Sequence, residues 1–263
     1  MDKQNTISYD DLKTPLVNLN EELDNLQTVV MLSVNGINNS QLAPRIVEFL
    51  AESDKFSTGD EIRLNEAKII AQKGIKEIEN EFSLIYSIGV VMLYSYLEGM
   101  IKSFIINYLK NNSIHDLKEF CAVKISLAEY MKLEENEKYD YLFQQYEKSI
   151  SNGIQYGVTR FETLLAPIQF SGIVEKGITK TIFELAQIRN NILHRNGIVD
   201  HYLKKSCPWL NLKTGDKIKV TQKDFVLFSK AIQGYLVTML IRIGEKKGSD
   251  MTKEKDFVQK LEF

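Results

Sequence analysis

Three polar side chains near the end of a predicted helix could perform acid–base chemistry together. The segment Glu184–Gly197 is predicted to be helical, and it contains Arg189, Asn190 and His194. Asn190 and His194 are four residues apart and therefore share one helix face. An imidazole can transfer protons near neutral pH, and a guanidinium group is a permanent cation. This combination suits a reaction in which a proton moves while negative charge develops on a phosphoryl oxygen.

Cleavage of RNA by its own 2′-hydroxyl group is a reaction of this kind. The deprotonated 2′-oxygen attacks the adjacent phosphorus and leaves a 2′,3′-cyclic phosphate. His194 would transfer the proton, and Arg189 or the neighbouring Arg195 would bind the phosphoryl oxygens. Asn190 would orient the imidazole or contact phosphate. Because no H-E-x-x-H sequence, paired cysteines or acidic cluster indicates a metal site, no metal or other cofactor is expected.

Arg189 lies in the middle of a predicted apolar stripe, where a charged group needs a partner. The stripe consists of Ile178, Ile182, Leu185, Ile192 and Leu193. Residues 82–101 form a second, almost entirely apolar segment, and Glu98 is its only charged residue. Leaving either charge buried and unpaired would cost several kcal/mol. We therefore expect Glu98 and Arg189 to form an ion pair.

This expected pair has two versions. If Arg189 is locked to Glu98 in the core, Arg195 is the cation that binds phosphate. If the pair instead lies at the mouth of a groove between two copies of the chain, Glu98 orients Arg189 and both serve the site, which is the version we favour. In a third arrangement both groups reach solvent at helix edges without pairing.

The composition predicts a mainly helical protein. The chain has 263 residues with only 4 prolines and 14 glycines, and it is long enough to bury a large core. Its net charge is -2 with both signs interspersed, so any contact with RNA must come from a local patch or a dimer groove. Cys121 and Cys207 lack neighbours at metal-ligand spacing and are expected to be packing residues in a cytoplasmic protein.

The apolar segment at residues 82–101 would just span a bilayer by length. Its three serines, three tyrosines and Glu98 favour a buried core helix instead, and its flanks lack an aromatic belt with a basic side. No association with a membrane is therefore expected.

The chain divides into three parts by pattern. Residues 1–79 are predicted to form an N-terminal helical arm, in which residues 35–40 indicate a loop. Residues 80–245 are predicted to form the main helical domain, with a small β-hairpin near residues 210–220. Residues 246–263 are predicted to be a charged C-terminal tail. The expected fold class is therefore all-α with one small hairpin.

The helix motif resembles the signature of the HEPN superfamily, an arginine and a histidine separated by four to six residues. Arg189 and His194 match its R-x4-H form, and Asn190 is the preferred polar residue after the arginine. Three segments are also similar to the RiboL-PSP branch of that superfamily: Val91–Lys102, Gly157–Leu165 and His194–Asp200. The resemblance covers residues 80–245 and leaves the N-terminal arm unexplained.

This resemblance implies a HEPN-type helical bundle and a metal-independent endoribonuclease. Arg189, Asn190 and His194 would be its catalytic residues, and Glu98 and Arg195 would support them. It further implies RNA as the substrate and a homodimer that brings two motifs together. It also suggests a toxin or antiphage-defence effector, with an antitoxin or a larger defence complex as a partner.

Two other functions fit the same residues. A noncatalytic HEPN module would bind RNA, a nucleotide or a partner protein without turnover. A structural interaction protein would use its apolar helices for assembly, with Arg189 and His194 as hydrogen-bonding core residues. His201 competes with His194 for a chemical role, but it lies beyond the helix stop at Gly197 and is expected to be structural or solvated.

Overall fold

The computed structural model describes residues 9–53, 58–150 and 156–263, and these residues are mostly helical, which confirms the predicted all-α class. The α-helices and 3-10 helices (η) are, in chain order, α1 (Tyr9–Ser40), α2 (Ala43–Ser53), α3 (Thr58–Glu79), α4 (Ser83–Asn111), η1 (Ile114–Asp116), α5 (Lys118–Cys121), α6 (Leu127–Tyr130), α7 (Glu135–Ile150), α8 (Val158–Leu165), η3 (Ala166–Ile168), α9 (Lys176–Arg195), α10 (His201–Ser206), η4 (Pro208–Leu210), α11 (Gln222–Lys246) and α12 (Thr252–Gln259).

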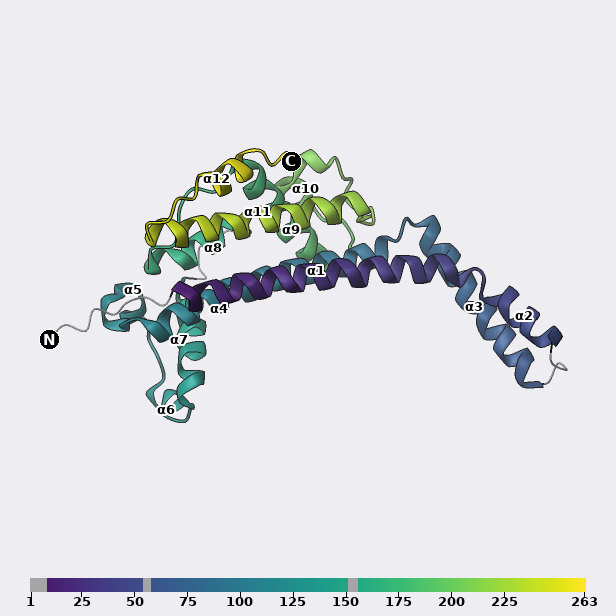
Figure 1. Cartoon of the computed structure of the whole chain (residues 1–263), viewed down its shortest axis with the longest axis horizontal. Helices are drawn as coiled ribbons and strands as arrows, with labels where there is room; N and C mark the ends of the chain where they lie inside the picture. Colours follow the sequence, from purple (N-terminus) through teal and green to yellow (C-terminus); the bar gives the residue numbers. More distant parts are fainter. Residues whose placement is uncertain (1–8, 54–57, 151–155) are drawn as a thin grey trace.

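Helix α4 is the centre of the fold because it is apolar on nearly all sides. Val90, Leu93, Leu97 and Phe104 are all fully buried along its length. Helix α1 lies along α4, and α9 and α11 also pack against it (Figure 1). The buried central helix predicted over residues 82–101 is therefore confirmed, and it continues to Asn111.

Helices α4 and α11 are both long and apolar enough to cross a membrane, by length and composition only. In this fold both are core helices. Phe228, Ile232 and Tyr235 of α11 are buried in the same apolar cluster as the inward residues of α4. Much of the apolar surface of each helix is therefore covered by other helices of the same chain.

The molecule consists of a body and a projecting arm (Figure 1). The arm comprises α2, α3 and the last turns of α1. The first part of α1 belongs to the body, since Leu12, Leu16 and Leu23 are buried in the same cluster as α4 and α11. The N-terminal region thus contributes one helix to the core and extends two more beyond it.

Residues 35–40, expected to form a loop, instead continue α1. Helix α3 packs so closely here that a Cβ added at Gly74 would overlap Ser40 Oγ and lie 3.3 Å from the carbonyl oxygen of Ile37. Packing against α3 therefore stabilises a helical conformation that asparagine and glycine disfavour on their own.

The hairpin predicted near residues 210–220 is not confirmed. Within the described residues this segment pairs with the chain that follows α9, through an isolated antiparallel bridge between Ile198 and Lys217. The backbone N–H of Ile218 donates to the carbonyl of Gly197 at 2.8 Å. The alternating pattern correctly indicates an extended segment, but it does not specify which segment pairs with it.

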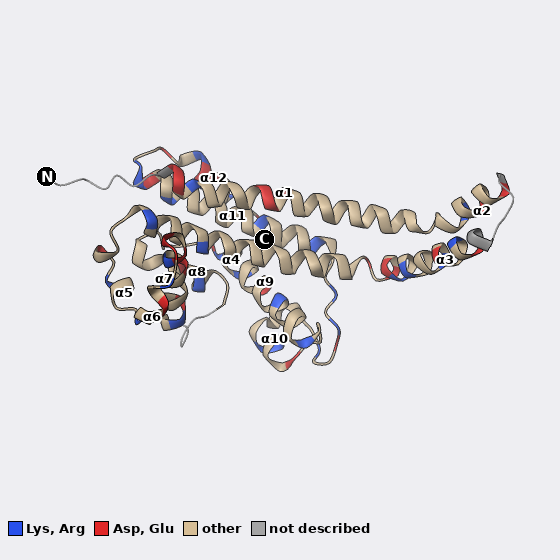
Figure 2. Cartoon of the chain, turned by 90° about the horizontal axis from the view of Figure 1, so that it is seen from below, with Lys and Arg blue, Asp and Glu red and all other residues tan. Residues whose placement is uncertain are grey.

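Residues 246–263, predicted to be a charged tail, contain α12, which packs on α11. Val258 is buried, and Leu261 contacts the core. Acidic and basic residues are mixed along the helices that face solvent, as expected from the small net charge (Figure 2).

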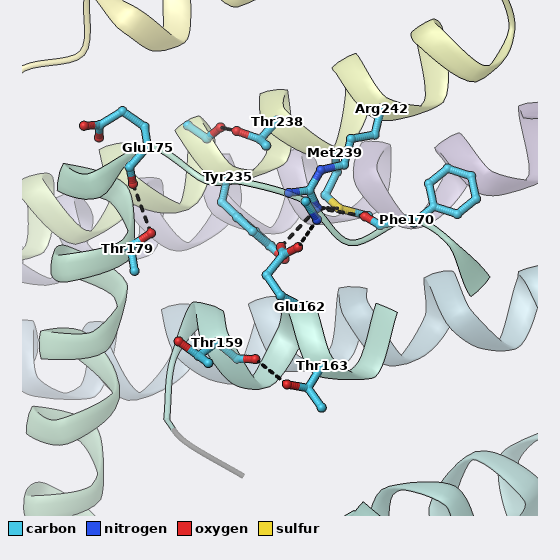
Figure 3. Close-up of polar contacts among 12 residues, drawn as sticks. Thr159, Glu162, Thr163, Phe170, Glu175, Thr179, Tyr235, Thr238, Met239 and Arg242 are labelled. Carbon is cyan, nitrogen blue, oxygen red and sulfur yellow. Dashed lines mark hydrogen bonds and ion pairs between the residues drawn. The ribbon is translucent and has the colours of Figure 1, made fainter. Parts of the chain in front are cut away.

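A largely buried ion pair joins α8 to α11 (Figure 3). Arg242 Nη1 donates to Glu162 Oε1 at 3.0 Å and to the carbonyl of Phe170 at 2.8 Å. The hydroxyl of Tyr235 donates to the same carboxylate oxygen at 2.7 Å, and the N–H of Gly172 donates to the other at 2.7 Å. Burial raises the pKa of Tyr235 well above its usual value, so the hydroxyl stays protonated and donates. The cluster fixes α8 on the body.

Candidate active site

The predicted motif occupies the last two turns of α9. The helix ends at Arg195 because the next two residues are left-handed, Asn196 with a φ of 54° and Gly197 with a φ of 70°. Lys217 Nζ donates to the carbonyl of Asn196 at 2.8 Å and so satisfies one free helix-end acceptor. The helix therefore stops next to the glycine that the sequence indicated.

A groove of about 430 Å³ beside the end of α9 brings together the five site residues predicted from the sequence. We call it the motif groove. Helix α9 contributes Arg189, Asn190, His194 and Arg195, and α4 contributes Glu98. Residues that lie far apart in the chain are therefore neighbours around one cavity.

Glu98 pairs with two guanidinium groups. Arg189 Nη2 lies 3.6 Å from Glu98 Oε2, so the predicted ion pair is confirmed. Arg160 Nη1 lies closer, at 2.6 Å from Oε1, and Arg160 Nη2 contacts Glu147. The side chains of Glu98 and Arg189 are 26% and 22% exposed. Arg160 is thus the main partner of Glu98, while Arg189 is held less tightly and also lines the groove.

Arg160 and Asp200 are charged groove residues that were not among the predicted site residues. Arg160 is the one that contacts Glu98. It lies on α8, which begins directly after Gly157, a residue with a φ of 68°. A Cβ at this position would lie 2.9 Å from the Cα of Phe183, so glycine allows the start of α8 to approach α9 closely. This approach places Arg160 beside the Glu98–Arg189 pair. Because Glu162 lies on the same short helix, Arg160 is not a lone charge, and the criterion that identified Arg189 does not single it out.

Two adjacent asparagines of α9 have different roles. Asn190 Oδ1 accepts a hydrogen bond from Arg189 Nη1 at 3.0 Å, so this amide orients the guanidinium rather than an imidazole. Asn191 was not predicted, yet it is buried and lines the groove. Neither its Oδ1 nor Arg189 Nε has a hydrogen-bond partner among the described residues. Buried polar atoms of this kind are rare, and both belong to residues that line the groove.

His194 is exposed at the groove, and no hydrogen bond to its ring is formed within the described part of the chain. The imidazole is therefore available to a ligand. Arg195 Nε lies 3.5 Å from Asp200 Oδ2, but the Arg195 side chain remains 60% exposed. Asp200 also caps α10, accepting from the N–H of Leu203 at 2.8 Å. His201 begins α10 and does not line the groove.

Comparisons with known proteins do not assign this chain to a family. The chain matched no protein-family model, no curated protein and no solved structure. A function for the chain therefore has to be argued from the motif groove and its residues.

Three tyrosines give the groove aromatic walls. Tyr94 is buried, and burial raises its pKa to about 12, so the hydroxyl remains protonated at neutral pH. The guanidinium carbon of Arg189 lies 5.6 Å from the centre of the Tyr94 ring, within cation–π range. Tyr156 and Tyr202 line the groove with exposed rings. Aromatic faces beside cations suit the bases and phosphates of a nucleic acid.

Replacing Glu98 with alanine is expected to destabilise the fold, because the change leaves Arg160 and Arg189 close together without the carboxylate that they share. Since the three groups are partly exposed, we expect the free energy of unfolding to fall by about 1 to 3 kcal/mol. Chemical denaturation measures this change. As a matched control, Asp140→Asn removes an exposed partner of Lys102 and should cost less than about 1 kcal/mol. Equal losses in the two variants would contradict a structural role for Glu98.

Proposed function

We propose that this chain is a metal-independent endoribonuclease of the HEPN type, which cleaves RNA and leaves a 2′,3′-cyclic phosphate. The motif groove carries the proposal, because it combines the exposed imidazole of His194 with three guanidinium groups. These are Arg160, Arg189 and Arg195. Glu98 and Asp200 line the same groove, so three cations less two carboxylates leave one positive charge in excess. An anionic phosphodiester complements that charge.

Each step of the proposed reaction uses a group of the groove. The 2′-oxygen bonds to phosphorus while the bond from phosphorus to the 5′-oxygen breaks, and the 2′-OH proton passes to His194. Arg189 and Arg195 stabilise the non-bridging oxygens, where negative charge grows in the transition state. The 5′-oxygen leaves with a proton from a second imidazole, supplied by another copy of the chain in a homodimer. Glu98 keeps Arg189 oriented toward the groove.

The biological setting that we propose rests on the resemblance of the R-x4-H motif to the HEPN signature. The chain would act on RNA in the cytoplasm as a toxin or an antiphage-defence effector. An antitoxin or a defence-complex partner would control its activity.

Cleavage of labelled RNA in EDTA tests the proposal. The wild-type chain is expected to cut the RNA and produce cyclic-phosphate ends, because the groove residues need no metal for this reaction. A matched strand with 2′-deoxyribose throughout lacks the attacking oxygen and is expected to remain intact. Equal cleavage of both strands, or loss of cleavage in EDTA, would contradict the mechanism. No cleavage of any of a diverse set of RNAs would favour a function in binding.

A noncatalytic module that binds RNA or a nucleotide is the second candidate. It is favoured by the polar contacts of the groove, in which Asn190 engages Arg189 and no described residue orients the ring of His194. Such a module needs the cations but no proton-transfer group. His194→Ala would then retain affinity for RNA in a fluorescence anisotropy assay, and Arg195→Ala would weaken it, with no cleavage by the wild type.

A further inference from the structure

We infer that the arm pairs with the arm of a second copy of this chain, through an antiparallel contact between the two α2 helices. Helix α2 lies at the end of the arm far from the body, and it exposes large apolar side chains (Figure 1). Ile46 and Phe49 are 54% and 72% exposed, and Leu42, directly before the helix, is 48% exposed. Their spacing of four and then three residues places them in one stripe. Contiguous exposed apolar residues of this kind mark interaction surfaces.

This apolar stripe is not the face that α2 uses within its own chain. Ala51 is buried and Val47 is half-buried, and they lie on the other side of the helix, where α2 packs against α3. Helix α2 therefore has two apolar faces, one toward α3 and one away from it. The outer stripe has the spacing of a seam between two paired helices.

The charges beside the stripe indicate that its partner is a second copy. Arg45 and Glu52 are both exposed and are seven residues apart, so they lie on the same flank of the stripe. In an antiparallel pair of identical helices, equivalent flanks of the two copies face each other. Arg45 of one copy then lies opposite Glu52 of the other, and the two-fold axis forms this contact twice. The surface is complementary to itself in both apolarity and charge.

Sedimentation velocity of the full chain, from about 1 to about 200 μM, tests this interface. The wild type is expected to show a concentration-dependent equilibrium between monomer and dimer. Phe49→Lys and Arg45→Glu are each expected to weaken dimerisation by about tenfold or more, which corresponds to about 1.4 kcal/mol. The double variant Arg45→Glu/Glu52→Arg reverses both charges and is expected to recover the dimer. Leu127→Lys, at a 68% exposed apolar position on α6, is the matched control and should behave as the wild type.

Three results would overturn the inference. The first is a wild type that remains monomeric over the whole range. The second is a double variant that dimerises no better than Arg45→Glu, because charge repulsion would then not explain the loss. The third is a dimer that persists in Phe49→Lys but is lost in Arg195→Ala, which would assign the interface to the motif groove. Circular dichroism verifies the helix content of each variant. The proposed nuclease mechanism needs its own contact between two motif grooves, and the variants separate the two contacts because Phe49→Lys affects only α2 and Arg195→Ala affects only the groove.

Discussion

His194→Ala is expected to reduce RNA cleavage by about 10² to 10⁴-fold while the helical fold is retained. The imidazole is exposed, and no described residue forms a hydrogen bond with its ring. Its removal therefore leaves no cavity in the core and no other group without a hydrogen-bond partner. In the proposed mechanism, the 2′-OH proton would then have to pass to water, while the arginines of the groove would still bind phosphate. The expected signature is a fall in kcat with little change in KM, measured on labelled RNA in EDTA.

The matched control for this prediction is His201→Ala. His201 is also exposed and lies only seven residues further along, but it does not line the motif groove. Its removal should leave cleavage close to that of the wild type. The prediction fails if both histidine variants lose the same activity. It also fails if His194→Ala lowers the melting temperature enough to explain the lost activity, because the histidine would then be structural.

Glu162→Ala is expected to lower the free energy of unfolding by about 3 to 5 kcal/mol, the range for breaking a buried ion pair. The side chains of Glu162 and Arg242 are only 16% and 11% exposed. Removing the carboxylate leaves the Arg242 charge in the core, where Arg242 Nη2 already has no partner among the described residues. Tyr235 loses its acceptor at the same time. Chemical denaturation followed by circular dichroism measures the loss.

Glu245→Ala provides the comparison for this loss. Glu245 lies on α11, as Arg242 does, and pairs with Lys255, but both side chains are about half exposed, so its removal should cost less than about 1 kcal/mol. A cost for Glu162→Ala no greater than that for Glu245→Ala would contradict the prediction. Glu162→Gln, which keeps the shape and one acceptor oxygen, should fall between them. Because α8 carries Arg160, we also expect weaker RNA cleavage by Glu162→Ala.

The helices of the body could be predicted from sequence because their signals are local. The run of apolar residues around Glu98 and the periodicity around Arg189 each identify a buried helix without reference to the rest of the chain. A lone charge on the apolar stripe around Arg189 and another in the apolar segment 82–101 were enough to predict their ion pair. The position of Arg160 could not be predicted in this way, since it depends on the close approach of α8 to α9 at Gly157.

Other features depended on tertiary contacts that a linear pattern does not encode. Leu193 was assigned to the buried stripe of α9, yet it is 49% exposed, and Ile188 and Asn191 are buried instead. The contacting face of α9 thus shifts around the helix near its end, where the motif groove opens. The extended segment near residues 210–220 likewise found its partner after α9 rather than within itself.

Helix α1 packs in the body, but the chain connects it to α4 through the arm, as a linker connects a tethered ligand to its binding site. Helix α1 packs along α4 and also contacts α11, whereas the covalent path from α1 to α4 runs out along the arm and back (Figure 1). The arm as a whole is therefore the connection that sets the effective concentration of α1 at its binding surface. This connection consists of packed helices, so the contacts of α1 with α3 in the arm add to those of α1 with α4 and α11 in the body.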